Sequence, residues 1–242
     1  MITEKQTKAL NDIIKSSKRA VFFGGAGVST ESGIPDFRSA DGIYMMNYRY
    51  PPEEILSHMF FMQHTEEFYE FYRKHLCGKG VEPNAAHLKL AELERAGILA
   101  AVVTQNIDGL HTKAGSKTVY ELHGSTLRNH CMKCGKFYDA DYVFGSEGVP
   151  KCSCGGVIKP DVVLYQEALD EDTVDGAIRA IKDADTLIVA GTSLTVYPAA
   201  SFIRYFKGND LIIINRDPTP QDGSFDFVIH DSVGKVLSKI NL

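Results

Sequence analysis

The chain of 242 residues has a formal net charge of −5, with 44% hydrophobic and 24% charged residues. This composition is typical of a globular protein with one large domain, or with one large and one small domain. The acidic balance argues against broad nucleic-acid binding by phosphate neutralisation. No apolar run reaches the roughly 20 residues of a membrane helix, and the N-terminus has no signal pattern. We therefore expect a cytoplasmic monomer with neither nucleic-acid nor membrane partners.

The first predicted elements are a helix over 4–17 and a buried strand that begins at Ala20. Glycines and small residues follow this strand in the run Gly25-Ala26-Gly27-Val28-Ser29. Glycines let a backbone approach a pyrophosphate, so the run is typical of a phosphate-binding turn after a parallel strand. Because Thr30 replaces the third glycine of the usual dinucleotide fingerprint, an ordinary strand-to-helix turn is the alternative. Arg38 follows closely and can face a phosphate.

A turn-rich stretch over 39–44 comes next, of the kind that often covers a ligand. A helical region then begins at Pro51 and runs to about residue 75. Its aromatic residues at helical spacing predict a packed core, with a lined groove as the alternative; they are Phe60, Phe61, Phe68, Phe71 and Tyr72. Cys77 stands apart from the other cysteines and is expected to be a partly buried thiol.

Alternating strands and helices are predicted for the rest of the chain, apart from one insertion. The helices are expected over 85–96, 170–182, 198–206 and 233–240, and the strands over 98–104, 119–122, 162–165, 186–190, 211–214 and 227–229. Continuous apolar strands alternating with helices indicate an α/β fold with a Rossmann-like parallel sheet covered by helices. In the first of these helices, Leu88, Leu90 and Leu93 are expected to face the core.

Polar residues follow the carboxyl ends of several predicted strands. The run Gln105-Asn106-Ile107-Asp108 follows one strand, Gly191-Thr192-Ser193 follows another, and Asn215 follows a third. Open α/β sheets bind their ligands at these strand ends. Together with the glycine-rich turn, these residues predict a dinucleotide pocket in which Asn215 can hydrogen-bond a ribose.

His123 lies at the tip of the strand over 119–122 and is the strongest candidate for a catalytic base, because an imidazole titrates near neutral pH. A structural histidine is the alternative, and we assign His87 and His111 to packing or hydrogen bonding. The chain has no G-x-S-x-G elbow, no P-loop lysine and no H-E-x-x-H. Hydrolysis by a serine or by a zinc-bound water is therefore not supported.

The segment 125–157 interrupts the parallel pattern and is interpreted as a small inserted module. It contains Cys131-x-x-Cys134 and Cys152-x-Cys154, which offer four thiolates in two close pairs. Four soft ligands suit one structural zinc ion and leave no position for a catalytic water. A set of free thiols is the alternative.

Taken together, these motifs resemble the sirtuins, the NAD-dependent protein lysine deacylases, and are most similar to the compact bacterial members. The resemblance runs from about residue 20 to the C-terminus in the order of the family. It includes the four cysteines and the stretches 25–29, 32–38, 104–108, 110–111, 123–124, 159–163, 191–194 and 196–199.

The resemblance implies a Rossmann-like NAD-binding domain formed by 1–43, 76–124 and 158–242. A small domain, formed by 44–75 and 125–157, would contain a helical segment and a zinc ribbon. NAD and an acyl-lysine protein or peptide would bind in the cleft between the two domains. The acyl group would pass from lysine to ADP-ribose, with release of nicotinamide and O-acetyl-ADP-ribose.

The resemblance also implies a role for each site residue. His123 would deprotonate a ribose hydroxyl, Asn106 would order the ribose and waters, and Asp108 would hold the nicotinamide carboxamide. The residues implied in NAD binding are Gly25, Ala26, Gly27, Thr30, Phe37, Arg38, Gln105, Asn106, Ile107, Asp108, His123, Gly191, Thr192, Ser193, Asn215 and Asp231. Among them, Ser193 and Arg38 would serve the phosphates, and Asn215 and the residues near Asp231 would serve the adenosine end.

The peptide would lie between two strand-like edges by β-augmentation. These edges would be formed by Val162, Val163, Leu164, Tyr165, Val196 and Tyr197. The Phe-Gly-Glu usual in the family reads Tyr165-Gln166-Glu167 here, which leaves the loop shape and the peptide preference open. Members that prefer succinyl- or malonyl-lysine carry a Tyr-x-x-Arg pair, and we find none between Tyr44 and His75. We therefore expect a neutral acyl group, acetyl first.

Two other functions stay open on the sequence alone. A mono-ADP-ribosyltransferase would use the same pocket and leave ADP-ribose on a protein. A binding module would recruit a partner through the zinc ribbon without turnover, and the presence of Asn106, Asp108 and His123 argues against it.

Overall fold

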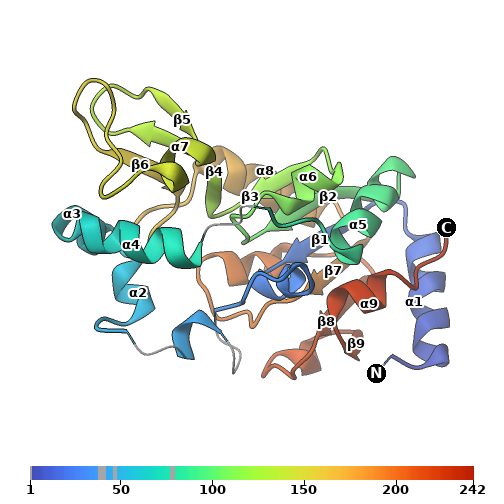
Figure 1. Ribbon diagram of the computed structural model, residues 1–242. Coiled ribbons are helices and arrows are strands. Elements are labelled where there is room, and N and C mark those ends of the chain that lie inside the picture. Colours follow the sequence, from blue (N-terminus) through green and yellow to red (C-terminus); the bar gives the residue numbers. More distant parts are fainter. Residues whose placement is uncertain (1, 38–41, 46–47, 77–79) are drawn as a thin grey trace.

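The computed structural model describes residues 2–37, 42–45, 48–76 and 80–242 (Figure 1). Arg38, residues 39–41 of the predicted covering stretch and Cys77 lie outside the described residues. The predictions made for them therefore stay as sequence predictions.

Within the described residues, six parallel strands form the central sheet in the order β3-β2-β1-β7-β8-β9. Their bounds are β1 Ala20–Gly24, β2 Leu99–Thr104, β3 Val119–Glu121, β7 Thr186–Ala190, β8 Asp210–Asn215 and β9 Phe227–His230. The predicted Rossmann-like parallel sheet is thus confirmed. The strand order reverses between β1 and β7, and parallel sheets with such a reversal open a crevice at the carboxyl ends of those two strands.

The sheet is covered on both faces because the side chains of β1 alternate between two cores. Phe22 packs into the first core and Phe23 into the second, and both are fully buried. The first core is covered by α1 Glu4–Ser16, α5 Ala85–Arg95 and α9 Val233–Leu237. The second is covered by α8 Glu171–Lys182 and by the 3₁₀ helix η4 Ala199–Tyr205. Continuous apolar strands are therefore explained by burial on two sides.

Two helix predictions need correction. The helix expected over 198–206 is the 3₁₀ helix η4, and the last helix, α9, ends at Leu237 rather than at 240. Leu88 was expected to face the core but is 53% exposed, whereas Leu90 and Leu93 are fully buried. Positions i and i+2 of a helix differ by about 200° around its axis, so Leu88 and Leu90 point in nearly opposite directions.

A second sheet is antiparallel and has the order β5-β4-β6. Its strands are β4 Gly124–Cys131, β5 Phe137–Asp139 and β6 Ile158–Val162, and α7 Ala140–Gly145 packs against β4 and β5. The prediction of a parallel-sheet strand over 162–165 is wrong, because the chain forms β6 earlier and pairs it with β4. The apolar residues Val162 and Leu164 instead pack into a third core.

This third core joins the antiparallel sheet to a helical segment (Figure 1). The helices are α2 Pro52–Ile55, α3 His58–Gln63 and α4 Thr65–His75. The Tyr69 hydroxyl donates to the Ile158 carbonyl, and the Arg73 guanidinium donates to the Gly148 carbonyl at 2.6 Å. The aromatic residues predicted as core are all buried here, with at most 6% exposure: Phe60, Phe61, Phe68, Phe71 and Tyr72.

Shorter elements connect these layers. They are η1 Ala26–Val28, η2 Thr30–Ser32, η3 Ile43–Met45, α6 Leu110–Ala114 and η5 Asp222–Ser224. Among the residues described, none of the helices has the length and apolar character needed to span a bilayer.

Candidate functional site

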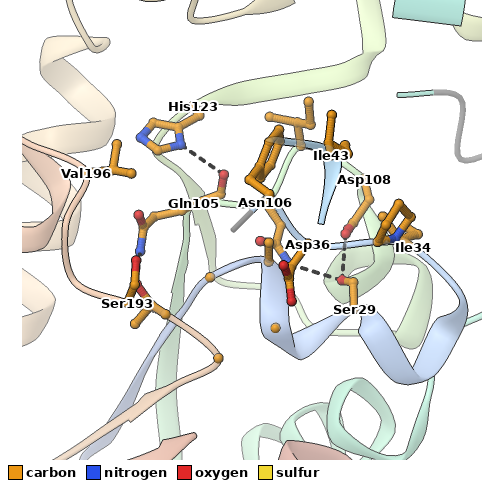
Figure 2. Close-up of a pocket in the computed structure, with 18 of the residues that line it drawn as sticks. Ser29, Ile34, Asp36, Ile43, Gln105, Asn106, Asp108, His123, Ser193 and Val196 are labelled. Carbon is orange, nitrogen blue, oxygen red and sulfur yellow. Dashed lines mark hydrogen bonds between the residues drawn. The ribbon is translucent and has the colours of Figure 1, made fainter. Parts of the chain in front are cut away.

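The carboxyl ends of the parallel strands open into a cavity of about 590 Å³, which Figure 2 shows. Every described residue of the predicted NAD-binding set lines it, except Asp231. The six residues of the two predicted peptide edges, which include Val163 and Val196, line the same cavity. The structure therefore brings together residues from the ends of several strands and from the antiparallel module.

The loops that follow β1 and β7 touch each other at the base of the cavity. The Gly27 N–H donates to the Gly191 carbonyl at 2.8 Å, and the Gly25 N–H donates to the Ala190 carbonyl at 3.1 Å. A Cβ on Gly27 would lie 2.8 Å from the Gly191 Cα, which is closer than such atoms approach. These glycines thus permit the close contact between the loops after β1 and β7. After the glycine-rich loop the chain forms short 3₁₀ turns rather than a long helix.

His123 projects into the cavity between the two sheets (Figure 2). Its Nδ1 lies 3.0 Å from the Gln105 carbonyl oxygen, which can only accept, so Nδ1 carries the proton of the neutral ring. The other nitrogen, Nε2, is then unprotonated. Burial lowers the pKa of His123 below its ordinary value, although the bond to the Gln105 carbonyl acts in the opposite direction. At neutral pH this ring is a free base.

A polar cluster lies across the cavity from His123 (Figure 2). The Ser29 hydroxyl donates to Asp108 Oδ2 at 2.6 Å and accepts from Asn106 Nδ2 at 3.0 Å. The other carboxylate oxygen of Asp108 accepts from the Leu110 N–H at 2.9 Å. Ser29 is 1% exposed and Asn106 is 8% exposed, so these bonds fix both side chains in place.

Two buried histidines lie behind this cluster, where His87 forms hydrogen bonds and His111 packs against the His87 ring; their assignment was packing or hydrogen bonding. His87 Nδ1 accepts from the Asn84 N–H at 3.2 Å, and its Nε2 lies 3.5 Å from the Ser29 hydroxyl. The His111 ring lies 4.7 Å from the His87 ring, centroid to centroid. Burial lowers the pKa of His87 to about 4 and that of His111 to about 3, so both rings are neutral at pH 7.

Asn215 and Asp231 differ in their relation to the cavity. The Asn215 amide donates to the Thr192 carbonyl and accepts from the Thr192 N–H, both at 3.0 Å, so it holds the loop after β7. Asp231 lies outside the cavity lining, but Ser232 lines it. Burial alone would raise the pKa of Asp231, yet hydrogen bonds from the Ile2 N–H and from Lys235 lower it to about 2.

Four cysteine sulfurs gather in the antiparallel module. Cys131 and Cys154 sulfurs lie 3.5 Å apart, Cys134 and Cys152 sulfurs lie 3.6 Å apart, and all four lie within 4.8 Å of one another. Sulfurs bound to one tetrahedral zinc at about 2.3 Å lie about 3.8 Å apart, which fits this cluster. The four cysteines are therefore positioned to bind one metal ion, as predicted. Cys131 ends β4, Cys134 lies in the turn between β4 and β5, and the other two lie in the turn before β6.

The sequence did not single out Ser29 as the centre of the polar cluster, nor His87 as its partner. Both residues lie far apart along the chain, and their meeting depends on how α5 packs beside the first core. The position of Ser29 at the end of the glycine-rich turn was the available signal. Ile43 and Leu56 also line the cavity and were not predicted to do so.

The fold and the site together define a nucleotide-binding α/β protein with an attached four-cysteine metal module. The model of the Sir2 family matches residues 25–198, and this chain belongs to that family. An NAD-dependent protein deacetylase of Clostridium acetobutylicum is 58% identical over 99% of this chain and 100% of its own length. One of Clostridium perfringens is 57% identical over 96% of each chain.

Solved structures show the same architecture. A solved structure of a Sir2 enzyme, which concerns the mechanism and regulation of these enzymes, has a TM-score of 0.89 and 43% identity. The match covers 98% of this chain and 96% of that one. A Sir2 homologue in complex with NAD has a TM-score of 0.87 and 39% identity, covering 96% and 91%. A Sir2 complex with a deacetylated p53 peptide and 3′-O-acetyl-ADP-ribose has a TM-score of 0.89 and 38% identity, covering 97% and 96%.

Proposed function

We propose that this chain is an NAD-dependent protein lysine deacetylase that transfers the acetyl group to ADP-ribose. It releases nicotinamide and O-acetyl-ADP-ribose. The observation that carries the proposal is the unprotonated Nε2 of His123, in a cavity lined by both the glycine-rich loops and the two strand-like edges. The deacetylase names of relatives up to 58% identical support the same conclusion.

His123 acts as the base in this proposal. NAD, when bound, would supply an electrophilic ribose carbon, to which the acyl oxygen of the substrate would bond as nicotinamide leaves. Nε2 of His123 would accept the proton of a ribose hydroxyl, whose oxygen would then attack the acyl carbon. The lysine amine would leave with a proton, and one water would add to the acyl carbon to give the acetyl ester of ADP-ribose. The Gln105 carbonyl holds Nδ1–H at 3.0 Å and stabilises the ring when it becomes positively charged.

Asp108 and Asn106 recognise polar groups on the opposite side. The Asp108 carboxylate, held by Ser29 and the Leu110 N–H, can accept from the N–H groups of a carboxamide. Asn106 uses its amide N–H₂ on Ser29, which leaves its carbonyl oxygen to accept from a ribose hydroxyl or a water. Each role follows from the acceptor atoms that the cluster leaves free to bind.

Apolar side chains exclude water from the reacting centre. Ile34, Phe37, Ile43 and Ile107 line the cavity beside the polar cluster. Water could attack the electrophilic ribose carbon, so an apolar lining at this place favours attack by the acyl oxygen instead.

We also propose the division into the two domains given by the sequence, a structural zinc ion on the four cysteines, and a monomer in the cytoplasm. The third core supports the small domain, since it contains the helical segment and the cysteine module. We further expect acetyl-lysine to be cleaved faster than succinyl-lysine, because Tyr69 and Tyr72 occupy α4 without an arginine at Tyr-x-x-Arg spacing. A higher rate with the succinyl peptide would contradict this preference.

The test is the variant His123→Tyr, assayed with NAD and an acetyl-lysine peptide. The wild type should form O-acetyl-ADP-ribose and free lysine, identified by mass spectrometry. His123→Tyr should lose both products while it keeps its fold and its zinc. His130→Tyr is the matched control, because His130 is exposed on β4 and does not line the cavity. Unchanged turnover in His123→Tyr would refute the assigned base, and ADP-ribose left on protein would favour a transferase.

A further inference from the structure

The hydroxyls of Tyr44 and Tyr165 lie 2.8 Å apart at the cavity and form a hydrogen bond. Tyr44 belongs to η3, and Tyr165 belongs to a predicted peptide edge, 121 positions further along the chain. We propose that Tyr165 is a positioning residue for NAD. Its hydroxyl fixes Tyr44 and, through Tyr44, holds Phe37 at the cavity wall. This inference rests on the proposed function, because it concerns the same cavity.

Tyr165 is the fixed partner of this pair. Its N–H donates to the Leu56 carbonyl at 2.9 Å, and its carbonyl accepts from the His58 N–H at 2.9 Å. Both backbone polar groups of Tyr165 are therefore bonded to the junction of α2 and α3. These bonds hold the backbone of Tyr165 against the helices of the third core, while its ring is 36% exposed.

The two residues that follow Tyr165 strengthen this anchor. Gln166 has a φ of +76°, in the left-handed region where the family pattern has a glycine, and its Oε1 accepts from the Met59 N–H at 3.1 Å. Glu167 accepts from Lys159 Nζ at 3.0 Å and lies 2.8 Å from His58 Nδ1. The loop keeps a glycine-like conformation without a glycine because side chains hold it.

Tyr44 in turn contacts Phe37 through its backbone and its ring. The Tyr44 N–H donates to the Phe37 carbonyl at 2.9 Å, and the two rings meet edge to face with centroids 5.6 Å apart. The neighbouring Ile43 N–H donates to the Asp36 carbonyl at 2.9 Å, and Ile43 is 1% exposed. A shift of the Tyr44 ring therefore moves Phe37, which lines the cavity beside the residues proposed to bind NAD.

Tyr165→Phe removes the hydroxyl bond and leaves the ring and the backbone edge in place. A partly exposed neutral hydrogen bond makes a small net contribution, so we expect NAD affinity to fall about two- to tenfold. The KM for the peptide should change less than the Kd for NAD, because the backbone bonds that hold this edge are retained. A merely structural role would change the melting temperature without separating the two substrates.

The test compares Tyr44→Phe, Tyr165→Phe and the double variant with the wild type. Calorimetry gives the Kd for NAD, and deacetylation kinetics give the KM for NAD and for the peptide. Each single variant should weaken NAD binding two- to tenfold. The double variant should match the single variants, because each single variant already removes the Tyr44–Tyr165 hydrogen bond. Tyr142→Phe is the control: the Tyr142 hydroxyl donates to the Lys151 carbonyl at 2.7 Å, away from the cavity.

Three results would overturn this inference: unchanged NAD affinity in the single variants, additive losses in the double variant, or an equal rise in the peptide KM. Failure of the proposed function gives a different result. In that case the wild type itself does not bind NAD or does not release acetyl groups. A wild type that does both, with variants that match it, refutes the positioning role alone.

Discussion

The buried histidine pair behind the polar cluster predicts a loss of stability in acid. His87 is 0% exposed and His111 is 2% exposed, and in the described part of the chain neither ring nitrogen of His111 has a hydrogen-bond partner. Protonation of His111 would place a charge beside Phe22, and protonation of either ring would place a charge in a site without water around it. Folding therefore lowers both pKa values, and the unfolded chain binds these two protons more readily than the folded chain.

The size of this loss follows from the two pKa values. The unfolded rings titrate near 6.5, whereas the folded values are about 4 for His87 and about 3 for His111. As the pH falls from 6.5 to 5, each ring lowers the free energy of unfolding by about 1.36 kcal/mol per pH unit. Each histidine thus costs about 2 kcal/mol by pH 5, and the pair costs about 4 kcal/mol.

The assay is urea unfolding at pH 7 and at pH 5, followed by far-ultraviolet circular dichroism, because the chain has no tryptophan. The variant His111→Asn removes one titrating ring and should lose about 2 kcal/mol less than the wild type over this range. Loss of metal in acid affects both proteins alike and cancels in the comparison. His130→Asn, at an exposed position on β4, should follow the wild type. Equal acid losses in wild type and His111→Asn would refute the reasoning.

Three further predictions concern the base, the metal and the loops. Because the pKa of His123 is lowered and the ring must be neutral to accept a proton, kcat should stay level above pH 6.5 and fall only below it; a fall that begins above pH 7 would contradict this assignment. Cys134→Ser should lose bound zinc in metal analysis and melt at a lower temperature, whereas Cys77→Ser should retain the ion; an equal zinc content in both would exclude the four-cysteine site. Gly27→Ala forces a methyl group to 2.8 Å from the facing backbone and should cost about 1–3 kcal/mol and weaken NAD binding. Gly145→Ala, where a Cβ meets nothing within 4 Å, is the control, and similar effects of the two substitutions would argue against the loop contact.

The sequence predicted the parallel sheet because its central strands β1 and β7 are buried along their whole length and are largely apolar. The same signal failed over 162–165, where Val162 and Leu164 are apolar because they enter the third core. A short apolar run shows that residues are buried but not which sheet they join. The eight-residue strand β4 was missed, since half of it faces solvent and its residues are polar.

The candidate site was predictable where ligand groups follow directly after a strand. Gln105, Asn106 and Asp108 lie at the cavity for this reason. The hydrogen bonds that connect them were not predictable, because Ser29 meets Asp108 across 79 positions of sequence. The same holds for Tyr44 and Tyr165, whose contact depends on the placement of the third core beside the sheet.

The central claim is that acetyl removal and NAD cleavage are one reaction, in which the group lost by lysine is recovered on ADP-ribose. The most direct measurement counts free lysine, nicotinamide and O-acetyl-ADP-ribose together in a single time course with the wild-type protein. The account predicts one of each for every acetyl group removed. Acetate released without consumption of NAD, or nicotinamide released with ADP-ribose attached to protein, would contradict it.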